Sequence, residues 1–397
     1  MTLLIGILYG FLLALDPGNH IFYLIKYGSL FAMDYAIIFL YSPLILKRVS
    51  PLLRVSTLIV LTLYLGIFTT SLVFYLYDRQ IYSLSEVIRI GLHIPVFIFM
   101  IWKKRDLSKY LIRSSFVFNA VGIFQYVIMG QQGRIQSLFS HPNFYSLYLI
   151  VVIIFIMEKV NFEGRKKFLS YSYIIFILLL LLFGTGARTS FAVAMVILAY
   201  NFFIFSKRRL LNIFGLVSLA ILSLPLYKYF SSYLMTTRIF NMSYGYTMPG
   251  QIDSYQWRLM RWSDGLSSFR DYPLINQIFG YGWQTSPILS RAFNGMAMHN
   301  EYLRMLVDFG VIGAAVYVIA LLSLFFYAVK KQRQKGYYSL SLIVLLIMIY
   351  SYSENIFVAG ESFAILLLSV ANSLSIINRK YLTRVENNND NKAVKAA

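Results

Sequence analysis

Long apolar runs alternate with short polar connectors along most of the chain. An α-helix needs roughly 20 consecutive apolar residues to cross a bilayer, and runs of about this length recur as far as residue 377. Residues 173–183 are continuously apolar and lack the period-two alternation of a membrane β-strand. Backbone groups in lipid must be hydrogen-bonded within their own segment, so these runs are predicted to be helices. The expected fold class is an all-α polytopic membrane protein.

About twelve transmembrane helices are predicted from these runs. Their expected ranges are 2–15, 28–46, 55–77, 84–102, 108–129, 142–157, 168–183, 189–205, 210–227, 302–329, 337–353 and 361–377. The first run has no basic leader and no small-residue cleavage site, so it is expected to be a retained helix. Residues 1–227 would then hold helices 1–9 and residues 302–377 helices 10–12. Residues 378–397 are predicted to be a disordered cytoplasmic tail.

Basic residues are concentrated in every second connector. The chain has 36 Lys and Arg against 16 Asp and Glu, a net charge of +20. With the N-terminus in the cytoplasm, every cytoplasmic connector is basic, as the positive-inside bias requires. This orientation places both termini in the cytoplasm and residues 228–301 outside the membrane. It also explains most of the net charge, so no nucleic acid is expected as a partner.

Positive residues outside these connectors are almost all arginine, and only Lys26 and Lys228 are lysine. Arginine binds phosphate and carboxylate through two directed N–H groups. An anionic ligand is therefore predicted at the outer face. Arginine that simply anchors the protein at the membrane interface is the alternative.

Residues 228–301 form the one long polar interval and are predicted to be an extracytoplasmic catalytic loop. Within it, the sequence WRLMRW opens a predicted amphipathic helix. Arg258 and Trp262 share one face of that helix, as do Trp257 and Arg261. Tryptophan favours the membrane interface, so the helix is expected to lie on the membrane with its arginines directed inward. An interfacial helix without a catalytic role is the alternative.

A tight outer turn is predicted at residues 184–190, GTGARTS, between two apolar runs. Arg188 then stands at the start of a helix, where the exposed amides and the helix dipole favour an anion. A charge at membrane depth is costly, which makes Arg188 a functional candidate. An arginine that extends to lipid headgroups is the alternative.

His299 and Asn300 lie at the outer start of the tenth apolar run. Histidine is the usual general base near neutral pH, although a capping role is the alternative. Spacings of three and four predict one shared helical face for His299, Leu303, Leu306, Gly310 and Gly313.

Three charged residues follow His299 at intervals of three and four. Glu301, Arg304 and Asp308 are predicted to neutralise one another inside a buried helix.

Weaker signals surround these motifs. Gly282 belongs to a GxG turn whose main chain could approach a sugar or phosphate, although a structural turn is the simpler interpretation. His141 and Asn143 begin the sixth apolar run and either line the site or cap the helix. The chain has four histidines and no cysteine, and neither a metal nor a cofactor motif is present, so no cofactor is expected.

Four motifs resemble, in order, the O-antigen ligase and Wzy-type polysaccharide polymerase superfamily of bacterial inner-membrane enzymes. They are SHPN at 140–143, GTGARTS at 184–190, WRLMRW through FGYG at 257–282, and HNEYLRMLVDFGVIG at 299–313. The last motif is the most specific, with Asp308 where members of the family often have glutamate. The first half of the chain resembles the family only in hydropathy.

This resemblance implies a GT-C-like helical fold and metal-independent, inverting transfer of a sugar chain from undecaprenyl pyrophosphate. Arg188 and Arg258 would hold the pyrophosphate, and His299 would activate the acceptor hydroxyl. The further candidates for substrate binding are Arg261, Asn300, Trp262, Gly282, His141 and Asn143. The polyprenyl chain would lie in a lateral groove among the helices.

A polymerase of the bacterial cytoplasmic membrane is favoured within this superfamily, with a flippase and a chain-length regulator as the partners it implies. A ligase acts on lipid A-core and needs a second membrane, whereas the Ile-, Tyr-, Lys- and Asn-rich composition is typical of an AT-rich Gram-positive genome. A transporter of lipid-linked oligosaccharide is the competing class. Asp34, Glu86 and Arg89 are charged residues within predicted membrane helices, and such residues are also typical of a transport pathway. Transporters commonly contain inverted repeats, and no convincing repeat is found.

Overall fold

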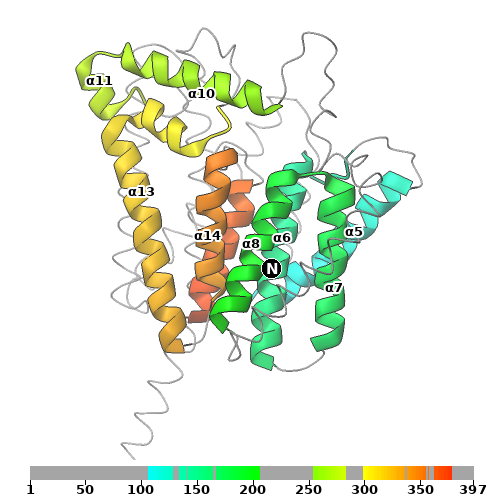
Figure 1. Ribbon diagram of the computed structural model, residues 1–397. Coiled ribbons are helices and arrows are strands. Elements are labelled where there is room, and N and C mark those ends of the chain that lie inside the picture. The colour runs from blue at the N-terminus through cyan, green and yellow to red at the C-terminus, as the bar shows by residue number, and fades with distance from the viewer. Residues whose placement is uncertain are drawn as a thin grey trace, which may run out of the picture. The chain divides into compact units, whose positions relative to one another are not determined.

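The computed structural model describes nine parts of the chain. These are residues 106–127, 134–139, 141–163, 167–205, 254–282, 298–335, 338–354, 356 and 362–377. All the regular elements within these ranges are helices, which confirms the all-α fold class (Figure 1). The chain divides into two compact units, one of residues 110–260 and one of residues 1–109 with 261–397.

The first of these units is built around a largely apolar, buried helix. Its elements are α5 (Ser108–Val127), α6 (Pro142–Glu163), α7 (Lys167–Leu179), the π-helix η1 (Leu180–Thr185) and α8 (Arg188–Phe205). The first two residues of α5 belong to the other unit. All side chains at residues 145–158 of α6 are buried, because α7, η1 and α8 pack around it. A helix that is apolar on every side is stable only in such a position or in lipid.

A small polar network joins three helices of this unit. The hydroxyl of Tyr145 on α6 donates to Asn119 Oδ1 on α5 at 2.6 Å. The amide nitrogen of Asn119 donates to the hydroxyl of Tyr173 on α7 at 2.9 Å. Buried polar groups are tolerated when they are paired in this way, so the network fixes the register of α5 against α6 and α7.

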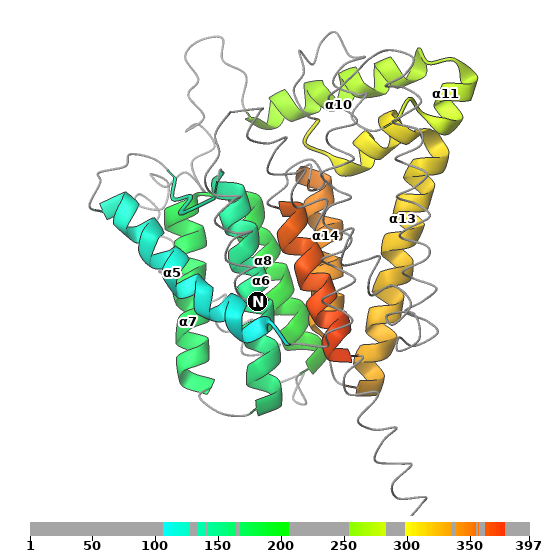
Figure 2. The same ribbon diagram turned by 180° about the vertical axis from the view of Figure 1, so that it is seen from behind.

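The other unit contains the remaining helices. They are most of α10 (Ser254–Arg270), α11 (Leu274–Phe279), α13 (Glu301–Lys335), α14 (Ser339–Ser353) and the helix Ser362–Ile377. α13 packs against both α11 and α14. The helix Ser362–Ile377 lies beside α14 in Figures 1 and 2, and the hydroxyls of Ser339 and Ser373 join the two helices at 2.9 Å.

α13 is bent at Gly310, whose φ of 67° and ψ of −171° are not helical. The bend separates a short first part, which carries Glu301, Arg304 and Asp308, from a long second part that is apolar as far as Val329 (Figure 1). Glycine adopts this backbone conformation at little cost, whereas other residues are strained there. The predicted face that joined His299, Leu303, Leu306, Gly310 and Gly313 is therefore wrong. His299 lies before the helix with a φ of 53°, and the bend turns the second part away from the first.

Seven predicted crossings correspond to described helices, at 108–129, 142–157, 168–183, 189–205, 302–329, 337–353 and 361–377. Within the described residues, three helical stretches are long and apolar enough to cross a membrane: Pro142–Val160, Phe168–Thr185 and Glu301–Gln332. The predicted crossings at 2–15, 28–46, 55–77, 84–102 and 210–227 lie outside the described residues, as does the tail at 378–397. The total of twelve therefore stays a prediction.

Candidate active site

The GTGARTS sequence forms the turn between η1 and α8, as predicted. Gly186 has a φ of 57° and ends the π-helix, and Arg188 is the first residue of α8. The buried Thr185 fixes the turn, because its hydroxyl donates to the carbonyl of Leu181 at 3.1 Å and accepts from the backbone N–H of Ala187 at 3.3 Å. The helix N-terminus that carries Arg188 is thus held by hydrogen bonds of the preceding turn.

Arg134 joins this turn to the start of α6. Its Nε donates to the carbonyl of Thr185 and its guanidinium NH2 to the side-chain oxygen of Asn143, both at 2.5 Å. The next residue, Ile135, donates its backbone N–H to the carbonyl of Gly184 at 2.9 Å. Two motifs far apart in sequence, SHPN and GTGARTS, are therefore held together by an arginine that the motif analysis did not single out.

His141 and Asn143 lie at the N-terminus of α6. The Nδ1 of His141 accepts from the backbone N–H of Asn143 at 3.2 Å, and its carbonyl accepts from the backbone N–H groups of Phe144 and Tyr145. His141 thus caps α6, which is the structural role that the sequence left open for it. Asn143 presents its amide oxygen to Arg134.

His299 pairs with a residue that the sequence analysis missed. Its Nδ1 lies 3.1 Å from Oε2 of Glu354, which follows the last residue of α14. The side chain of His299 is 36% exposed and that of Glu354 is 11% exposed. In the tautomer that donates from Nδ1 to the carboxylate, Nε2 carries the lone pair that accepts a proton.

A sequence signal for Glu354 exists in hindsight. Glu354 is the first charged residue after the apolar run 337–353, and the predicted topology puts that end of the run on the same side of the membrane as His299. Helices that are consecutive and antiparallel bring such ends together, and α13 packs against α14. A carboxylate at that position was therefore a candidate partner.

The backbone of His299 is held in a sparsely populated conformation. Its φ of 53° lies in the left-handed region, which a residue with a Cβ adopts only when its surroundings require it. Residues on both sides are fixed. The carbonyl of Met298 accepts from Trp262 Nε1 at 3.1 Å, and Asn300 caps α13. Strain of this kind is frequent at functional sites.

Trp262 and Asn300 therefore have defined positions beside His299. The ring of Trp262 on α10 meets the ring of Tyr352 edge to face, with centroids 5.2 Å apart. Asn300 is buried, and its side-chain oxygen accepts from the backbone N–H of Leu303 at 3.1 Å. Both residues hold the chain around His299 through these contacts. A direct contact of either with substrate stays a prediction.

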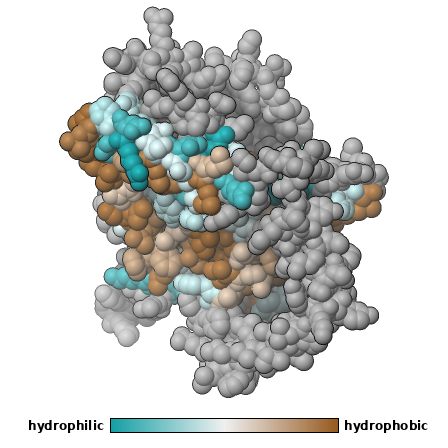
Figure 3. All heavy atoms as spheres, turned by 45° about the horizontal axis from the view of Figure 1, so that its top comes forward, coloured by the Kyte–Doolittle hydropathy of each residue, from teal (hydrophilic) through white to brown (hydrophobic). Residues whose placement is uncertain are grey.

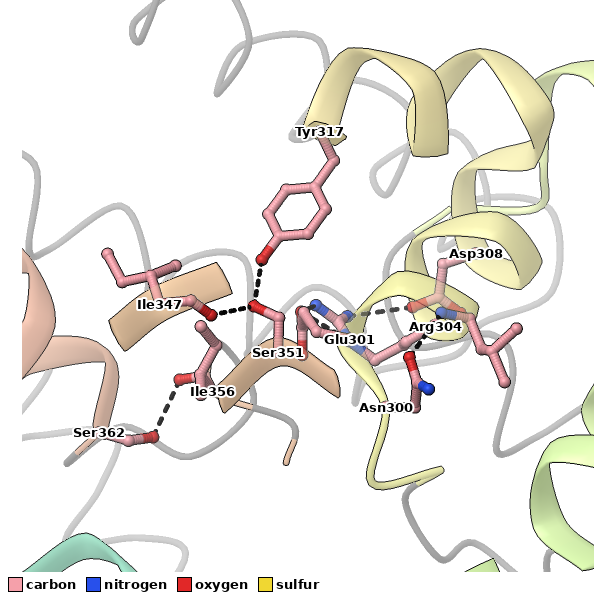
Figure 4. Close-up of polar contacts among 10 residues, drawn as sticks. Asn300, Glu301, Arg304, Asp308, Tyr317, Ile347, Ser351, Ile356 and Ser362 are labelled. Atoms are coloured by element: carbon pink, nitrogen blue, oxygen red, sulfur yellow. Dashed lines mark hydrogen bonds and ion pairs between the residues drawn. The ribbon is translucent and has the colours of Figure 1, made fainter. Parts of the chain in front are cut away.

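The first part of α13 contains the predicted charge cluster. Arg304 is fully buried and donates from Nε to Glu301 Oε1 at 3.0 Å and from NH1 to Asp308 Oδ2 at 3.1 Å (Figure 4). Its NH2 also contacts Glu301. The prediction that the three residues neutralise one another is confirmed. Since a buried charge is stable only when it is paired, the cluster is a structural unit that supports the helix behind His299.

The GYG sequence contacts the bend of α13. The backbone N–H groups of Tyr281 and Gly282 donate to the carbonyl of Asp308 at 3.0 and 2.7 Å. A Cβ on Gly280 would lie 2.1 Å from that same carbonyl oxygen, and one on Gly310 would lie 2.3 Å from the carbonyl oxygen of Ile278. The glycines thus allow two backbones to cross in direct contact. This is the structural turn that the sequence offered as the simpler interpretation of Gly282.

Tyr272 belongs to a small apolar core below this crossing. It packs with Met298 and Val307, and the ring of Tyr281 meets it edge to face at 4.7 Å. Burial, followed by the nearby carboxylate of Asp308 and the hydroxyl of Tyr281, raises the pKa of Tyr272 well above its ordinary value. Tyr272 therefore stays neutral and serves as a packing residue.

The predicted helix containing WRLMRW is confirmed as α10, on which Arg258 and Arg261 are both partly buried. Among the described residues, no group of three His, Asp or Glu side chains lies close enough to hold a metal ion. The structure thus brings His299, Glu354, Trp262 and Asn300 together in one unit. In the other unit it brings Arg134, Asn143 and the GTG turn together.

Comparison with known proteins agrees with the motifs. Residues 173–318 match the family model described as O-antigen ligase. The matched range includes the motifs at 184–190, 257–282 and 299–313, whereas SHPN precedes it. No curated protein was found to match the chain. The apolar helices together with this match identify a membrane protein, and residues 173–318 are similar to the O-antigen ligase family, which supports the resemblance that the sequence motifs carry.

Proposed function

We propose that the protein is a polysaccharide polymerase, which joins oligosaccharide repeat units carried on undecaprenyl pyrophosphate at the outer face of the bacterial cytoplasmic membrane. The observation that carries this proposal is the His299–Glu354 pair, with Nδ1 and Oε2 3.1 Å apart beside the N-terminus of α13. A histidine oriented by a carboxylate is a standard arrangement for a general base. The products would be capsular, exo- or O-antigen polysaccharide.

The proposed reaction needs one proton transfer and one displacement. The hydroxyl of the acceptor sugar attacks the anomeric carbon of the donor and loses its proton to Nε2 of His299. The bond between that carbon and the pyrophosphate oxygen breaks, and undecaprenyl pyrophosphate leaves with the electron pair. Attack on the face opposite the leaving group inverts the configuration of the anomeric carbon.

Arg188 and Arg258 are the proposed ligands of the pyrophosphate. Arg188 begins α8, where the helix dipole and the first N–H groups favour an anion, and the turn before it is fixed through Arg134. Arg258 lies on α10, four residues before Trp262, which contacts the carbonyl adjacent to His299. Positioned guanidinium groups stabilise the charge that develops on the leaving oxygens, so no metal is required in this mechanism. Arg261 is proposed to support the same anion.

Polymer formation by the purified full-length protein tests the proposal. The substrate is the undecaprenyl-pyrophosphate-linked repeat unit of the source bacterium, and EDTA is present throughout. We expect a ladder of products from the wild type and none from His299→Ala or Arg188→Ala. The matched control is Arg113→Lys, an exposed residue of α5, which should give the wild-type ladder. A full ladder from His299→Ala would refute the assignment of the base.

A ligase is the second candidate, because the family model that matches is described as O-antigen ligase. The same protein and donor, supplied with a lipid-linked glycan acceptor, distinguish the two reactions. A ligase would attach one glycan to that acceptor and form no ladder without it. Movement of the intact lipid-linked unit across a vesicle membrane, with no new glycosidic bond, would identify a transporter and overturn both enzymatic assignments.

A further inference from the structure

The short helix α11 (Leu274–Phe279) presents its apolar side chains outward. Leu274 is 73% exposed, Ile275 61% and Phe279 56%. Its polar side chains contact the protein instead. Gln277 Nε2 donates to the carbonyls of Arg270 and Tyr272 at 3.0 and 2.9 Å. In a surface helix that faces water, the polar side chains point outward and the apolar ones inward, so α11 shows the opposite arrangement. Large apolar groups that are exposed together usually mark a contact with lipid or another protein.

α11 is fixed to α13 at the bend. The backbones of the two helices touch at Gly280 and Gly310, and both N–H groups after Gly280 donate to the carbonyl of Asp308. Such close backbone contact leaves no room for α11 to shift along α13. The position of α13 in the membrane therefore determines the position of α11.

The bend lies at one edge of the part of α13 that is suited to the bilayer core. Residues 311–329 are apolar and rise about 29 Å at 1.5 Å per residue, which matches a hydrocarbon core of about 30 Å. Before the bend, α13 carries the buried charges of Glu301, Arg304 and Asp308. Directly after the bend, Val311 and Ile312 are 54% and 46% exposed. The membrane boundary therefore falls close to Gly310.

We infer that the outward side of α11 is inserted into the bilayer at this boundary and is covered by lipid acyl chains. Phe279 adjoins the crossing, and Val311 and Ile312 follow it, so the apolar surface of α11 continues onto the membrane-spanning part of α13 (Figure 3). This continuity favours lipid as the occupant over a separate protein. Helices that lie at a membrane surface bury their apolar side about 5–10 Å into the interface.

Insertion of α11 gives residues 271–282 a fixed depth in the membrane. α11 follows α10 after the short turn at residues 271–273, and its far end leads directly to the crossing below which Met298 and Tyr272 pack. The lipid contact would therefore hold Met298, the residue next to His299, at the level of the headgroups. This inference depends on α13 crossing the membrane and not on the reaction that the protein catalyses.

Fluorescence of single-cysteine variants tests the inference. The chain has no native cysteine, so Ile275→Cys and Phe279→Cys each provide one labelling site. The full-length protein is labelled with nitrobenzoxadiazole and placed in phosphatidylcholine vesicles. Asp271→Cys, at an exposed position in the turn before α11, is the matched control. Quenching is compared between a lipid spin-labelled on its acyl chain and iodide in water.

We expect blue-shifted emission at positions 275 and 279, strong quenching by the spin-labelled lipid and little by iodide, with the opposite result at position 271. Quenching of positions 275 and 279 by iodide, as at position 271, would overturn the inference. So would energy transfer between labels on two copies of the chain, because a second copy would then cover α11. Polymerase assays do not enter this test, so its failure is distinguishable from failure of the proposed function.

Discussion

The guanidinium of Arg134 lies 2.5 Å from the side-chain oxygen of Asn143 and, through Nε, the same distance from the carbonyl of Thr185. One side chain thus fixes the start of α6 against the turn that leads to Arg188. Lysine cannot make two directed bonds of this kind. The position of the proposed pyrophosphate ligand therefore depends on a residue that does not itself need to touch the substrate.

Arg134→Lys is expected to slow polymer formation about 10-fold or more, because a hydrogen bond to a charged group contributes about 1.5–3 kcal/mol. The initial rate of the ladder assay measures this effect. Asn143→Ala removes one of the two bonds and should have a smaller effect. The double variant should lose less activity than the two single effects on the activation free energy would give when added, since both changes act on the same hydrogen bond between Arg134 and Asn143. Additive effects would show that Arg134 and Asn143 act independently.

Glu354→Gln tests the partner of His299. The amide keeps the size of the side chain but removes the charge that stabilises a protonated imidazole. We expect kcat to fall with little change in KM, since the contact acts on proton transfer and not on substrate binding. The expected loss is smaller than the roughly 10²–10⁴-fold effect of removing a general base by His299→Ala. Both constants come from initial rates at varied donor concentration.

Glu354→Asp should recover part of the lost kcat, because it restores the carboxylate at a longer distance. Asp264→Asn on α10 is the control for loss of a carboxylate elsewhere and should leave both constants unchanged. A rise in KM alone for Glu354→Gln would instead assign Glu354 to substrate binding.

Hydropathy predicted the helices because each apolar run must bury or insert its whole surface. The ranges 168–183 and 189–205 are close to the observed α7–η1 and α8, and the turn between them is the predicted GTGARTS turn. The ion pairs of α13 were also predictable, because Glu301 and Asp308 lie three residues before and four residues after Arg304 in one helix. Interactions set by local spacing can be inferred from sequence.

The bend at Gly310 could not be predicted in the same way. Neither could the contact of Arg134 with Thr185 or that of His299 with Glu354. A glycine within an apolar run is compatible with a continuous helix, and only the backbone of residues 278–280 pressing on it explains its φ. Arg134 lies 51 residues from Thr185, and His299 lies 55 residues from Glu354. Hydropathy carries no information about which side chains meet across such separations.

The buried charges of α13 give a stability prediction. Arg304→Met would leave the carboxylates of Glu301 and Asp308 buried without their guanidinium, which typically costs about 3–5 kcal/mol. A clear fall in the unfolding temperature of the detergent-solubilised protein is the expected result. Adding Glu301→Gln and Asp308→Asn to Arg304→Met should restore much of the loss, because no uncompensated charge then remains. A triple variant as unstable as Arg304→Met would show that the loss comes from packing.

The crossing of α11 and α13 gives the last prediction. Gly310→Ala would place a Cβ 2.3 Å from the carbonyl oxygen of Ile278, in a backbone conformation with a φ of 67°. Neither backbone can yield without breaking the contact, so we expect the unfolding temperature to fall or the yield of folded protein to collapse. Gly184→Ala is the matched control. Its Cβ would lie 2.8 Å from Cδ1 of Ile135, the end of a flexible side chain that can move aside. Gly310→Ala should therefore be much less stable than Gly184→Ala. Equal stabilities in a thermal unfolding assay would mean that the backbone contact at the bend does not hold α11 in place.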